Sequence, residues 1–332
     1  MSEKFQGRIL ALGAGSVAQC TIPLLIEHLV DAKQITIMDM RDNRKRVQSA
    51  IDNGATYIQD QITKENLDSK LSQYLKTGDF LLDLAWNIDA NVIMQWCYDH
   101  GVMYLNTSLE LWDPYSNAVE RTPQERTLYV RHMKLREMKA GWDKNGPTMI
   151  VEHGANPGLV SHLVKKSLED IANRALKDGK ASAGVESALT SENYPLLAKE
   201  LSVKVIHIAE RDTQISDKPK QVNEFVNTWS VEGFYEEGVA PAELGWGTHE
   251  KRLPDKAYQH AAGPKNQICI AQPGAKTWVR SWVPNFEITG MVIRHGEAFT
   301  MSDHLTVWDG EKAIYRPTVH YAYCPTDAAI AS

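Results

Sequence analysis

Short apolar runs alternate with longer mixed segments through the first half of the chain. A strand buried on both faces is apolar along its whole length, whereas a covering helix is apolar on one side only. The alternation therefore predicts strand and helix units around a parallel sheet. The expected strands are residues 8–12, 34–39, 55–58, 80–84, 103–106 and 148–152, and the expected helices between them are 17–29, 44–52, 65–75 and 90–100.

The pattern changes from residue 156 onward. Helices are predicted over 123–139, 159–173 and 194–200, and short apolar runs follow at 204–209, 267–271, 277–283, 286–292, 298–300 and 305–308. Because these runs lack regular crossover helices, they indicate a mixed or antiparallel sheet. We therefore predict an α/β chain with a parallel-sheet domain over 1–155 and an α+β substrate and dimerisation domain over 156–332.

Composition and charge narrow the function classes. The 332 residues are 43% hydrophobic and carry a formal net charge of −6 without a basic block, which argues against a nucleic-acid surface or an anionic-membrane partner. No apolar run approaches the roughly 20 residues that cross a bilayer. The four cysteines form no C-x-x-C pair, so we expect reduced thiols, a cytoplasmic protein and no metal site.

A glycine-rich turn follows the first apolar strand. Gly13, Gly15 and Ala18 form a G-x-G-x-x-A pattern, in which the glycines permit a tight turn and a close approach to a pyrophosphate, with Ser16 and Val17 opening the helix. The pattern alone also fits a short apolar strand with glycines. Asp39, 24 residues after Gly15, is near the offset of a carboxylate that binds the ribose hydroxyls and repels a 2′-phosphate. The turn therefore predicts a Rossmann-type site for NAD rather than NADP.

Ligands of such sheets bind beyond the carboxyl ends of the strands. The segments that follow strands four, five and six are therefore candidates for cofactor contacts. The candidate residues are Ala85, Asn87, Thr107, Ser108, Asn156 and Pro157. Helix capping or ordinary turn chemistry explains these residue types equally well on spacing alone.

Other chemistries lack their minimal residues. The sequence His295-Gly-Glu297 matches half of a zinc-deaminase motif, but the P-C-x-x-C that this chemistry needs is missing. There is no G-x-S-x-G, Walker A, H-E-x-x-H or EF-hand pattern either. Hydrolase, nucleotide-hydrolysing and metalloprotease functions are therefore not supported.

Several long strings in the second half resemble bacterial homospermidine synthases. They are residues 154–161, 206–214, 225–234, 241–248, 272–275, 280–282 and 315–323, and the resemblance extends over essentially the whole chain. It implies a two-domain fold of the saccharopine-dehydrogenase type and a homodimer. Members of the family continue beyond the equivalent of residue 332, so the resemblance also implies that the second domain is incomplete at its C-terminus.

The implied reaction joins two putrescine molecules into sym-homospermidine with loss of ammonia, with spermidine as a further amine. A hydride leaves one amine carbon for NAD, the second diamine attacks the resulting imine, and the hydride returns to the new Schiff base. Such a site needs a carboxylate to hold or remove an amine proton and an anionic anchor for the distal ammonium. An aromatic face would stabilise the developing cation.

The family's roles fall on particular residues of this chain. Trp229 would be the cation–π face, Glu210 a carboxylate ligand for an amine, Asn156 a positioning group, and His295 with Glu297 the binder of the distal ammonium. Glu110, at the end of the fifth strand, is a candidate second anchor.

Structural interpretations of the same residues, without a role in chemistry, stay open. Glu210 pairs with Arg211 in one of them, Trp229 is a core residue in another, and His295 is a surface histidine in a third. Two rival functions also stay open, a Schiff-base reductase of the saccharopine or carboxynorspermidine type and a non-catalytic NAD-sensing protein.

Overall fold

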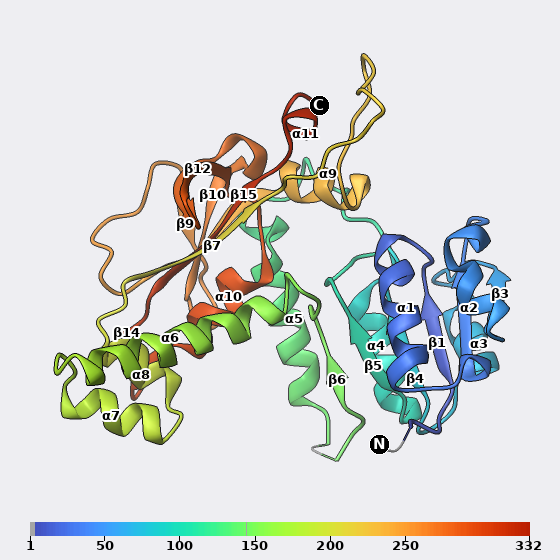
Figure 1. Cartoon of the computed structure of the whole chain (residues 1–332), viewed down its shortest axis with the longest axis horizontal. Coiled ribbons are helices and arrows are strands. Elements are labelled where there is room, and N and C mark those ends of the chain that lie inside the picture. Colours follow the sequence, from blue (N-terminus) through green and yellow to red (C-terminus); the bar gives the residue numbers. More distant parts are fainter. Residues whose placement is uncertain (1–3, 144) are drawn as a thin grey trace. The chain divides into compact units, whose positions relative to one another are not determined.

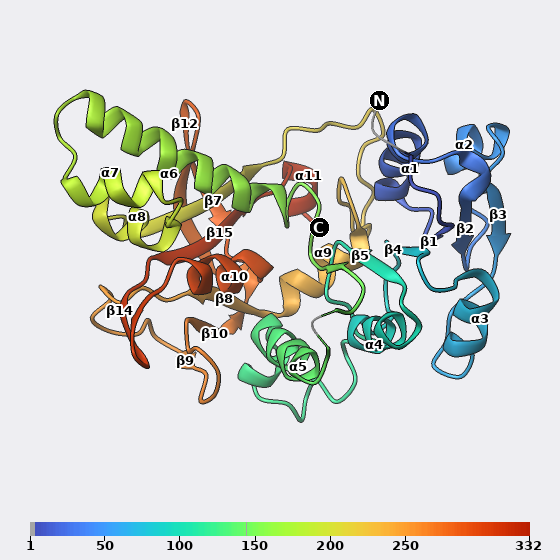
Figure 2. The same cartoon turned by 90° about the horizontal axis from the view of Figure 1, so that it is seen from below.

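The computed structural model describes residues 4–143 and 145–332, which divide into two compact units (Figures 1 and 2). Unit 1 comprises Met1–Ser116 and Lys134–Gly154, and unit 2 comprises Asn117–Met133 and Ala155–Ser332. The segment Asn117–Met133, which the expected boundary at residue 155 assigns to the first domain, thus belongs to the second compact unit.

Unit 1 contains one six-stranded parallel sheet in the order β3-β2-β1-β4-β5-β6. Its strands are β1 (Ile9–Leu12), β2 (Ile35–Asp39), β3 (Thr56–Gln59), β4 (Phe80–Asp83), β5 (Met103–Asn106) and β6 (Met149–Ile150). The connecting helices are α1 (Ser16–His28), α2 (Gln48–Asp52), α3 (Leu67–Tyr74) and α4 (Ala90–His100), with single 3-10 turns at Ala32–Gln34 and Arg44–Val47. The predicted Rossmann-type parallel sheet is confirmed.

Alternate residues of the central strand build two separate cores. Ile9 and Ala11 of β1 pack with residues of α1 and α2, whereas Leu10 and Leu12 pack with residues of α3 and α4. Successive side chains of a strand point to opposite faces, so a continuous apolar strand requires helices on both sides. Figure 2 shows α1 and α2 on one side of the sheet and α3 and α4 on the other.

Unit 2 is built on a seven-stranded mixed sheet. Its path is β11-β12-β15-β8-β10-β9, and β7 pairs with β15 in parallel. The strands are β7 (Val205–Arg211), β8 (Pro241–Gly245), β9 (Ala257–Gln259), β10 (Gln267–Pro273), β11 (Trp278–Val283), β12 (Phe286–Met291) and β15 (Thr318–Cys324). A separate hairpin joins β13 (Val307–Asp309) to β14 (Lys312–Tyr315). The predicted α+β domain on a mixed sheet is confirmed.

Unit 2 also contains helices, most of which share one hydrophobic core with strands of this sheet. They are α6 (Leu159–Lys177), α7 (Ala183–Thr190), α8 (Tyr194–Glu200), α9 (Val231–Val239), α10 (Gly296–His304) and α11 (Asp327–Ile330), with a 3-10 turn at Gly274–Lys276. Figure 1 shows the long α6 lying along α7 and α8. The predicted helix over 123–139 is a 3-10 turn, Gln124–Arg126, followed by α5 (Leu128–Ala140). Among residues 4–143 and 145–332, no helix is long and apolar enough to span a membrane.

In the second half one predicted strand is wrong, and strands β8, β9, β14 and β15 were not predicted. Residues 298–300 were expected to form a strand but lie in α10, where Ala298, Phe299 and Met301 are buried. Three apolar-looking residues are too few to show a period, so a short helix face and a strand cannot be distinguished. Strand β15 was not predicted at all, because its sequence T-V-H-Y-A-Y-C is not an apolar run although six of its seven residues are buried.

Candidate functional site

The turn between β1 and α1 requires glycine at two positions for different reasons. Gly13 has a φ of +91°, and a Cβ there would lie 2.7 Å from the Leu84 carbonyl oxygen. Its N–H donates to the Met38 carbonyl at 2.8 Å, which ties the turn to β2. Gly15 faces open space, since a Cβ built on it meets no atom within 4 Å. The turn therefore leaves its backbone accessible above Gly15.

Helix α1 begins at this open turn. Gly15 is its N-cap and offers no side-chain acceptor, while Ser16 and Val17 of the first turn are exposed and Ala18 is fully buried. The positive end of the helix and its first N–H groups are thereby available to an anion. The turn at Gly13–Gly15 and the first turn of α1, together called the glycine cradle below, fit the pyrophosphate of a dinucleotide.

The Asp39 carboxylate at the end of β2 holds the glycine turn. One oxygen accepts hydrogen bonds from the Ala14 N–H at 2.7 Å and from the Asn43 amide at 3.1 Å, and the other accepts from the Arg41 N–H at 2.8 Å. Asp39 therefore places a negative charge beside the cradle, in the position where it would oppose a 2′-phosphate.

A buried hydrogen-bond chain joins the ends of β4, β5 and the segment after β6. The Asn106 amide donates to the Tyr104 hydroxyl at 2.9 Å, and this hydroxyl donates to Asp83 at 2.8 Å. Asp83 also accepts from the Ala85 N–H at 3.3 Å, and Asn106 accepts from the Glu152 N–H at 2.8 Å. Burial raises the pKa of Asp83 to about 7. No residue pattern in the sequence predicted these hydrogen bonds.

Of the six predicted cofactor contacts that follow the strands, Ala85, Asn87, Thr107 and Ser108 lie in unit 1, whereas Asn156 and Pro157 lie in unit 2. Asn87 has a φ of 63°, and its side-chain oxygen is buried without a hydrogen-bond partner in the described part of the chain. The Ser108 hydroxyl donates to a Glu110 carboxylate oxygen at 2.6 Å, and Thr107 is half-buried. An orphaned buried amide oxygen beside an open glycine turn is consistent with a ligand group completing this edge of the sheet.

In unit 2, Asn156 and Glu210 meet although 54 residues separate them. The Asn156 amide donates to Glu210 Oε2 at 2.9 Å, and the Asn156 side-chain oxygen is buried without a partner among the described residues. Asn156 precedes the cis peptide bond to Pro157, and Glu210 is the sixth residue of β7. The amide therefore presents one donor to the carboxylate and leaves an acceptor unused.

His295 and Glu297 form a second buried group at the start of α10. The His295 ring Nδ1 is hydrogen-bonded to Glu297 Oε2, and Glu297 Oε1 accepts from the Gly158 N–H at 3.0 Å. Only 7% of His295 and 2% of Glu297 are exposed, so the reading of His295 as a surface histidine is wrong. Gly158 lies two residues after Asn156, so one loop contacts both groups.

Trp229 lies just before α9 and is partly exposed. Its indole Nε1 donates to the Tyr323 hydroxyl at 3.2 Å, and 39% of the residue is accessible, so the reading of Trp229 as a core residue is wrong. Glu210 does not pair with Arg211 either, because the Arg211 guanidinium lies 5.1 Å from the centroid of the Phe286 ring. Adjacent residues of a strand point to opposite faces.

Two tyrosines of β15 connect these groups, and sequence reasoning assigned neither a role. The Tyr321 hydroxyl donates to Glu210 Oε2 at 2.8 Å, and the rings of Tyr321 and Tyr323 are stacked with centroids 5.9 Å apart. Burial raises the pKa of Tyr323 to about 12. Both residues stand in the 315–323 string that carries the family resemblance, which was the only signal for them. Glu237 of α9 is a further carboxylate close enough to Tyr321 to raise its pKa.

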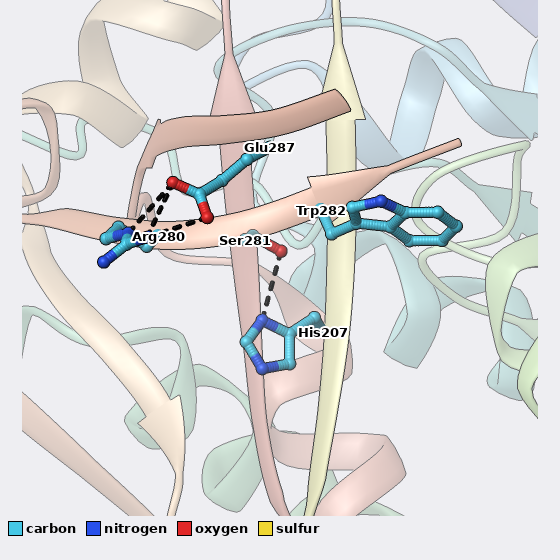
Figure 3. Close-up of a pocket in the computed structure, with 5 residues that line it drawn as sticks. All are labelled: His207, Arg280, Ser281, Trp282 and Glu287. Carbon is cyan, nitrogen blue, oxygen red and sulfur yellow. Dashed lines mark hydrogen bonds and ion pairs between the residues drawn. The ribbon is translucent and has the colours of Figure 1, made fainter. Parts of the chain in front are cut away.

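A cavity of about 500 Å³ lies on the face of β7 opposite to Glu210 (Figure 3). Its lining residues are His207, Arg280, Ser281, Trp282 and Glu287, none of which was a predicted site residue. Figure 3 shows β11 crossing β7, with the His207 ring below Ser281. The His207 Nδ1 and the Ser281 hydroxyl are 3.1 Å apart, so β7 has polar contacts on both of its faces.

The two units thus offer complementary chemistry. Unit 1 has a glycine cradle for a dinucleotide with an anion at its rim. Unit 2 has a carboxylate, Glu210, held by an amide and a phenol, a buried histidine–carboxylate pair, and a partly exposed indole. Carboxylates and an indole face suit a cationic amine.

Known proteins match both halves of the chain. The family model described as the saccharopine dehydrogenase NADP binding domain matches residues 9–150, and the model described as the saccharopine dehydrogenase C-terminal domain matches residues 154–332. Homospermidine synthase from Blastochloris viridis is 38% identical over 340 residues, which cover 99% of this chain and 68% of that protein. Homospermidine synthase from Mesorhizobium japonicum is also 38% identical, over 98% of this chain and 67% of that protein.

Solved structures of the same two kinds of protein are also similar to this chain. The homospermidine synthase of Legionella pneumophila, determined in complex with NAD, has a TM-score of 0.82 and 35% identity over 98% of this chain and 67% of that chain. An apo saccharopine dehydrogenase (L-Glu forming) from Saccharomyces cerevisiae has a TM-score of 0.51 at 15% identity, covering 98% of this chain and 56% of that chain, and therefore shares the fold.

Proposed function

The chain belongs to the homospermidine synthase family, and we propose that it joins two putrescine molecules into sym-homospermidine with release of ammonia and with NAD as the recycled cofactor. The observation that carries the proposal is the Glu210 carboxylate held by Asn156 and Tyr321 within a sequence 38% identical to these synthases. A putrescine ammonium is a cation of the size that such a carboxylate binds.

NAD would be held by the residues of unit 1. The turn at Gly13 and Gly15 and the first turn of α1 fit the pyrophosphate, and Asp39 favours a free ribose over a 2′-phosphate. Contacts from Ala85, Asn87, Thr107 and Ser108 of unit 1 belong to this proposal. Asn156 and Pro157, which lie in unit 2, are proposed as further cofactor contacts. When bound, the nicotinamide accepts a hydride from the amine carbon and returns it.

The residues of unit 2 would bind and orient the amines. Glu210 Oε1 would hold the reacting ammonium and receive its proton, because an amine must be deprotonated before its carbon loses a hydride. The exposed face of Trp229 would stabilise the cationic imine by a cation–π contact. His295 with Glu297 would bind the distal ammonium. In unit 1, Glu110 would be a further carboxylate anchor for an amine.

The test is turnover without an external reductant. The purified protein, putrescine and a catalytic amount of NAD are incubated, and homospermidine and ammonium are measured. We expect one ammonium for each homospermidine and no net NADH, because the hydride returns within each cycle. Net NADH without homospermidine would overturn the proposed reaction, as would a requirement for added NADH, which a Schiff-base reductase shows.

Assembly and location belong to the same proposal. A two-fold contact would use the outer side of β11, where Trp282 is 65% and Trp278 48% exposed and Arg280 lies 2.8 Å from Glu287. A surface with one cation and one anion side by side is complementary to its own copy about a two-fold axis.

The putrescine-processing homodimer would be cytoplasmic, consistent with cysteines that are all free thiols. The net charge of −6 disfavours a nucleic-acid partner.

A further inference from the structure

Tyr321 lies where the two carboxylate groups of unit 2 come together. Its hydroxyl donates to Glu210 Oε2 at 2.8 Å, and the same oxygen accepts from the Asn156 amide at 2.9 Å. Across the described residues, Glu210 Oε1 accepts no hydrogen bond. Two donors therefore fix the carboxylate by one oxygen and leave the other for an incoming ammonium.

The ring of Tyr321 contacts the second group. Its centroid is 4.5 Å from that of His295, with the planes tilted by 41°. His295 is hydrogen-bonded to Glu297, and Glu297 accepts from the Gly158 N–H. Gly158 and Asn156 belong to one loop, which therefore contacts both Glu297 and Glu210. Tyr321 also contacts both groups, Glu210 through its hydroxyl and the His295–Glu297 pair through its ring.

Strand register places Tyr321 in this position. Strands β7 and β15 are parallel with seven consecutive paired residues, among them Tyr321 opposite Ile208 and Tyr323 opposite Glu210. Paired residues of neighbouring strands point to the same face, and so do residues two apart on one strand. The two tyrosines and Glu210 therefore share a face, with Tyr321 diagonal to Glu210 and within hydrogen-bond reach.

The hydroxyl is a permanent donor rather than a titrating group. Only 5% of Tyr321 is exposed, and burial, followed by the neighbouring Glu210 and Glu237 carboxylates, holds its pKa well above the ordinary value of a phenol. A buried phenol needs a hydrogen-bond partner, and a carboxylate is a strong acceptor. The O–H therefore points at Glu210 throughout the neutral pH range.

We propose that Tyr321 is a positioning residue for the amine site, whose hydroxyl orients Glu210 toward the ammonium and whose ring holds His295 against Glu297. The inference rests on the proposed function, because it assigns to Glu210 the role of amine ligand. It extends that function by making a neutral phenol the link between the binding of the reacting amine and that of the distal amine.

The variant Tyr321→Phe separates the two contacts, since the ring stays against His295 and only the O–H to Glu210 is lost. We expect the Kd for putrescine, measured by calorimetry on the NAD-loaded protein, to rise about 10-fold. We also expect kcat/KM to fall by about 10- to 100-fold. The Kd for NAD should stay within about 2-fold, because unit 1 is unchanged.

A pH profile distinguishes positioning from a structural role. A carboxylate that loses a donor to its charged form binds a proton more readily, so the acid limb of putrescine binding should move to higher pH in Tyr321→Phe. The charged or titratable groups around Glu210 and Tyr321 are Tyr323, Glu237 and His295, which is hydrogen-bonded to Glu297. The control is Tyr315→Phe, which removes a half-buried hydroxyl that donates to the Val203 carbonyl at 2.7 Å and should change neither the profile nor the Kd.

The outcomes separate this inference from the proposed function. Unchanged putrescine affinity and an unchanged acid limb in Tyr321→Phe overturn the inference, as does an equal effect of Tyr315→Phe. Weakened, pH-shifted putrescine binding supports the inference even if the wild-type protein forms no homospermidine, a result that overturns only the proposed reaction. A wild-type protein that does not bind putrescine overturns both.

Discussion

At the scale of single residues, the site combines groups that are individually ordinary. Glutamate, asparagine, tyrosine and tryptophan are common in any domain, and none of them signals chemistry by type. What distinguishes Glu210 is that Asn156 and Tyr321 both donate to one of its oxygens. Hydrogen bonds to a charged acceptor are stronger than those between neutral groups, so the carboxylate has one preferred orientation.

Trp229→Ala tests the aromatic face. The change removes the cation–π surface and the donor to Tyr323 but leaves unit 1 untouched, so turnover should fall by more than about 10-fold while NAD binding is retained. Stopped-flow turnover and an NAD titration check the two parts. Trp229→Phe keeps an aromatic face and should retain more activity than Trp229→Ala; equal losses in the two variants would count against the cation–π role.

Asp83 gives a pH-dependent prediction for stability. The pKa of its buried carboxyl is raised from 3.8 to about 7, so between these values the unfolded chain is ionised while the native protein keeps its proton. The native state is therefore penalised increasingly as pH rises toward 7, by up to about 4 kcal/mol, and the penalty is absent below the unfolded value.

The variant Asp83→Asn lacks this titration. Its free energy of unfolding, relative to the wild-type protein, should rise by about 3 kcal/mol between pH 5 and pH 8. The loss of an ideal acceptor for Tyr104 shifts all values equally and does not change this slope. Urea denaturation of both proteins at several pH values measures the difference; parallel stability curves would contradict the assignment of the shifted carboxyl.

At the scale of elements, the strands of the unit 1 sheet were easier to predict from the sequence than those of the unit 2 sheet. The strands of unit 1 are apolar runs such as Ile9–Leu12 because helices cover both faces, and all six were predicted. Strand β15 was missed because its buried positions include His320, Tyr321 and Tyr323, which find polar or aromatic partners only in the folded sheet. The glycine turn has a spacing that the sequence reveals, whereas the contact of Asn156 with Glu210 depends on tertiary structure and was not predicted.

Gly290→Ala tests the crossing of the β11–β12 hairpin over β15. A Cβ at Gly290 would lie 2.8 Å from the Ala322 carbonyl carbon and 3.0 Å from the Tyr323 nitrogen. These are backbone atoms that cannot rotate away, so we expect a loss of about 1–3 kcal/mol in the free energy of unfolding. Gly141→Ala is the control, because its Cβ would meet only the Met138 carbonyl oxygen at 3.5 Å. Chemical denaturation compares them, and equal stabilities would contradict the close crossing.

At the scale of the whole molecule, the proposed two-fold contact through β11 makes a prediction about assembly. Arg280→Glu leaves two carboxylates at positions 280 and 287 and should convert the proposed homodimer into monomers. The exchanged pair Arg280→Glu with Glu287→Arg restores one charge of each sign and should dimerise again. Sedimentation velocity measures the mass of each variant; a dimer that persists in Arg280→Glu would exclude this surface as the contact.

Strand β15 also determines where the chain tolerates changes in length. Its odd positions 319, 321 and 323 belong to the core that includes the site tyrosines, whereas His320 stacks edge-on against His207 on the opposite face. Insertion of a single residue at Thr318 would exchange the two sets, burying histidine where tyrosine meets Glu210. A one-residue insertion among the exposed residues 221–224 would displace no such set. A change in length at Thr318 is therefore incompatible with the proposed amine site, whereas one among residues 221–224 leaves this site unchanged.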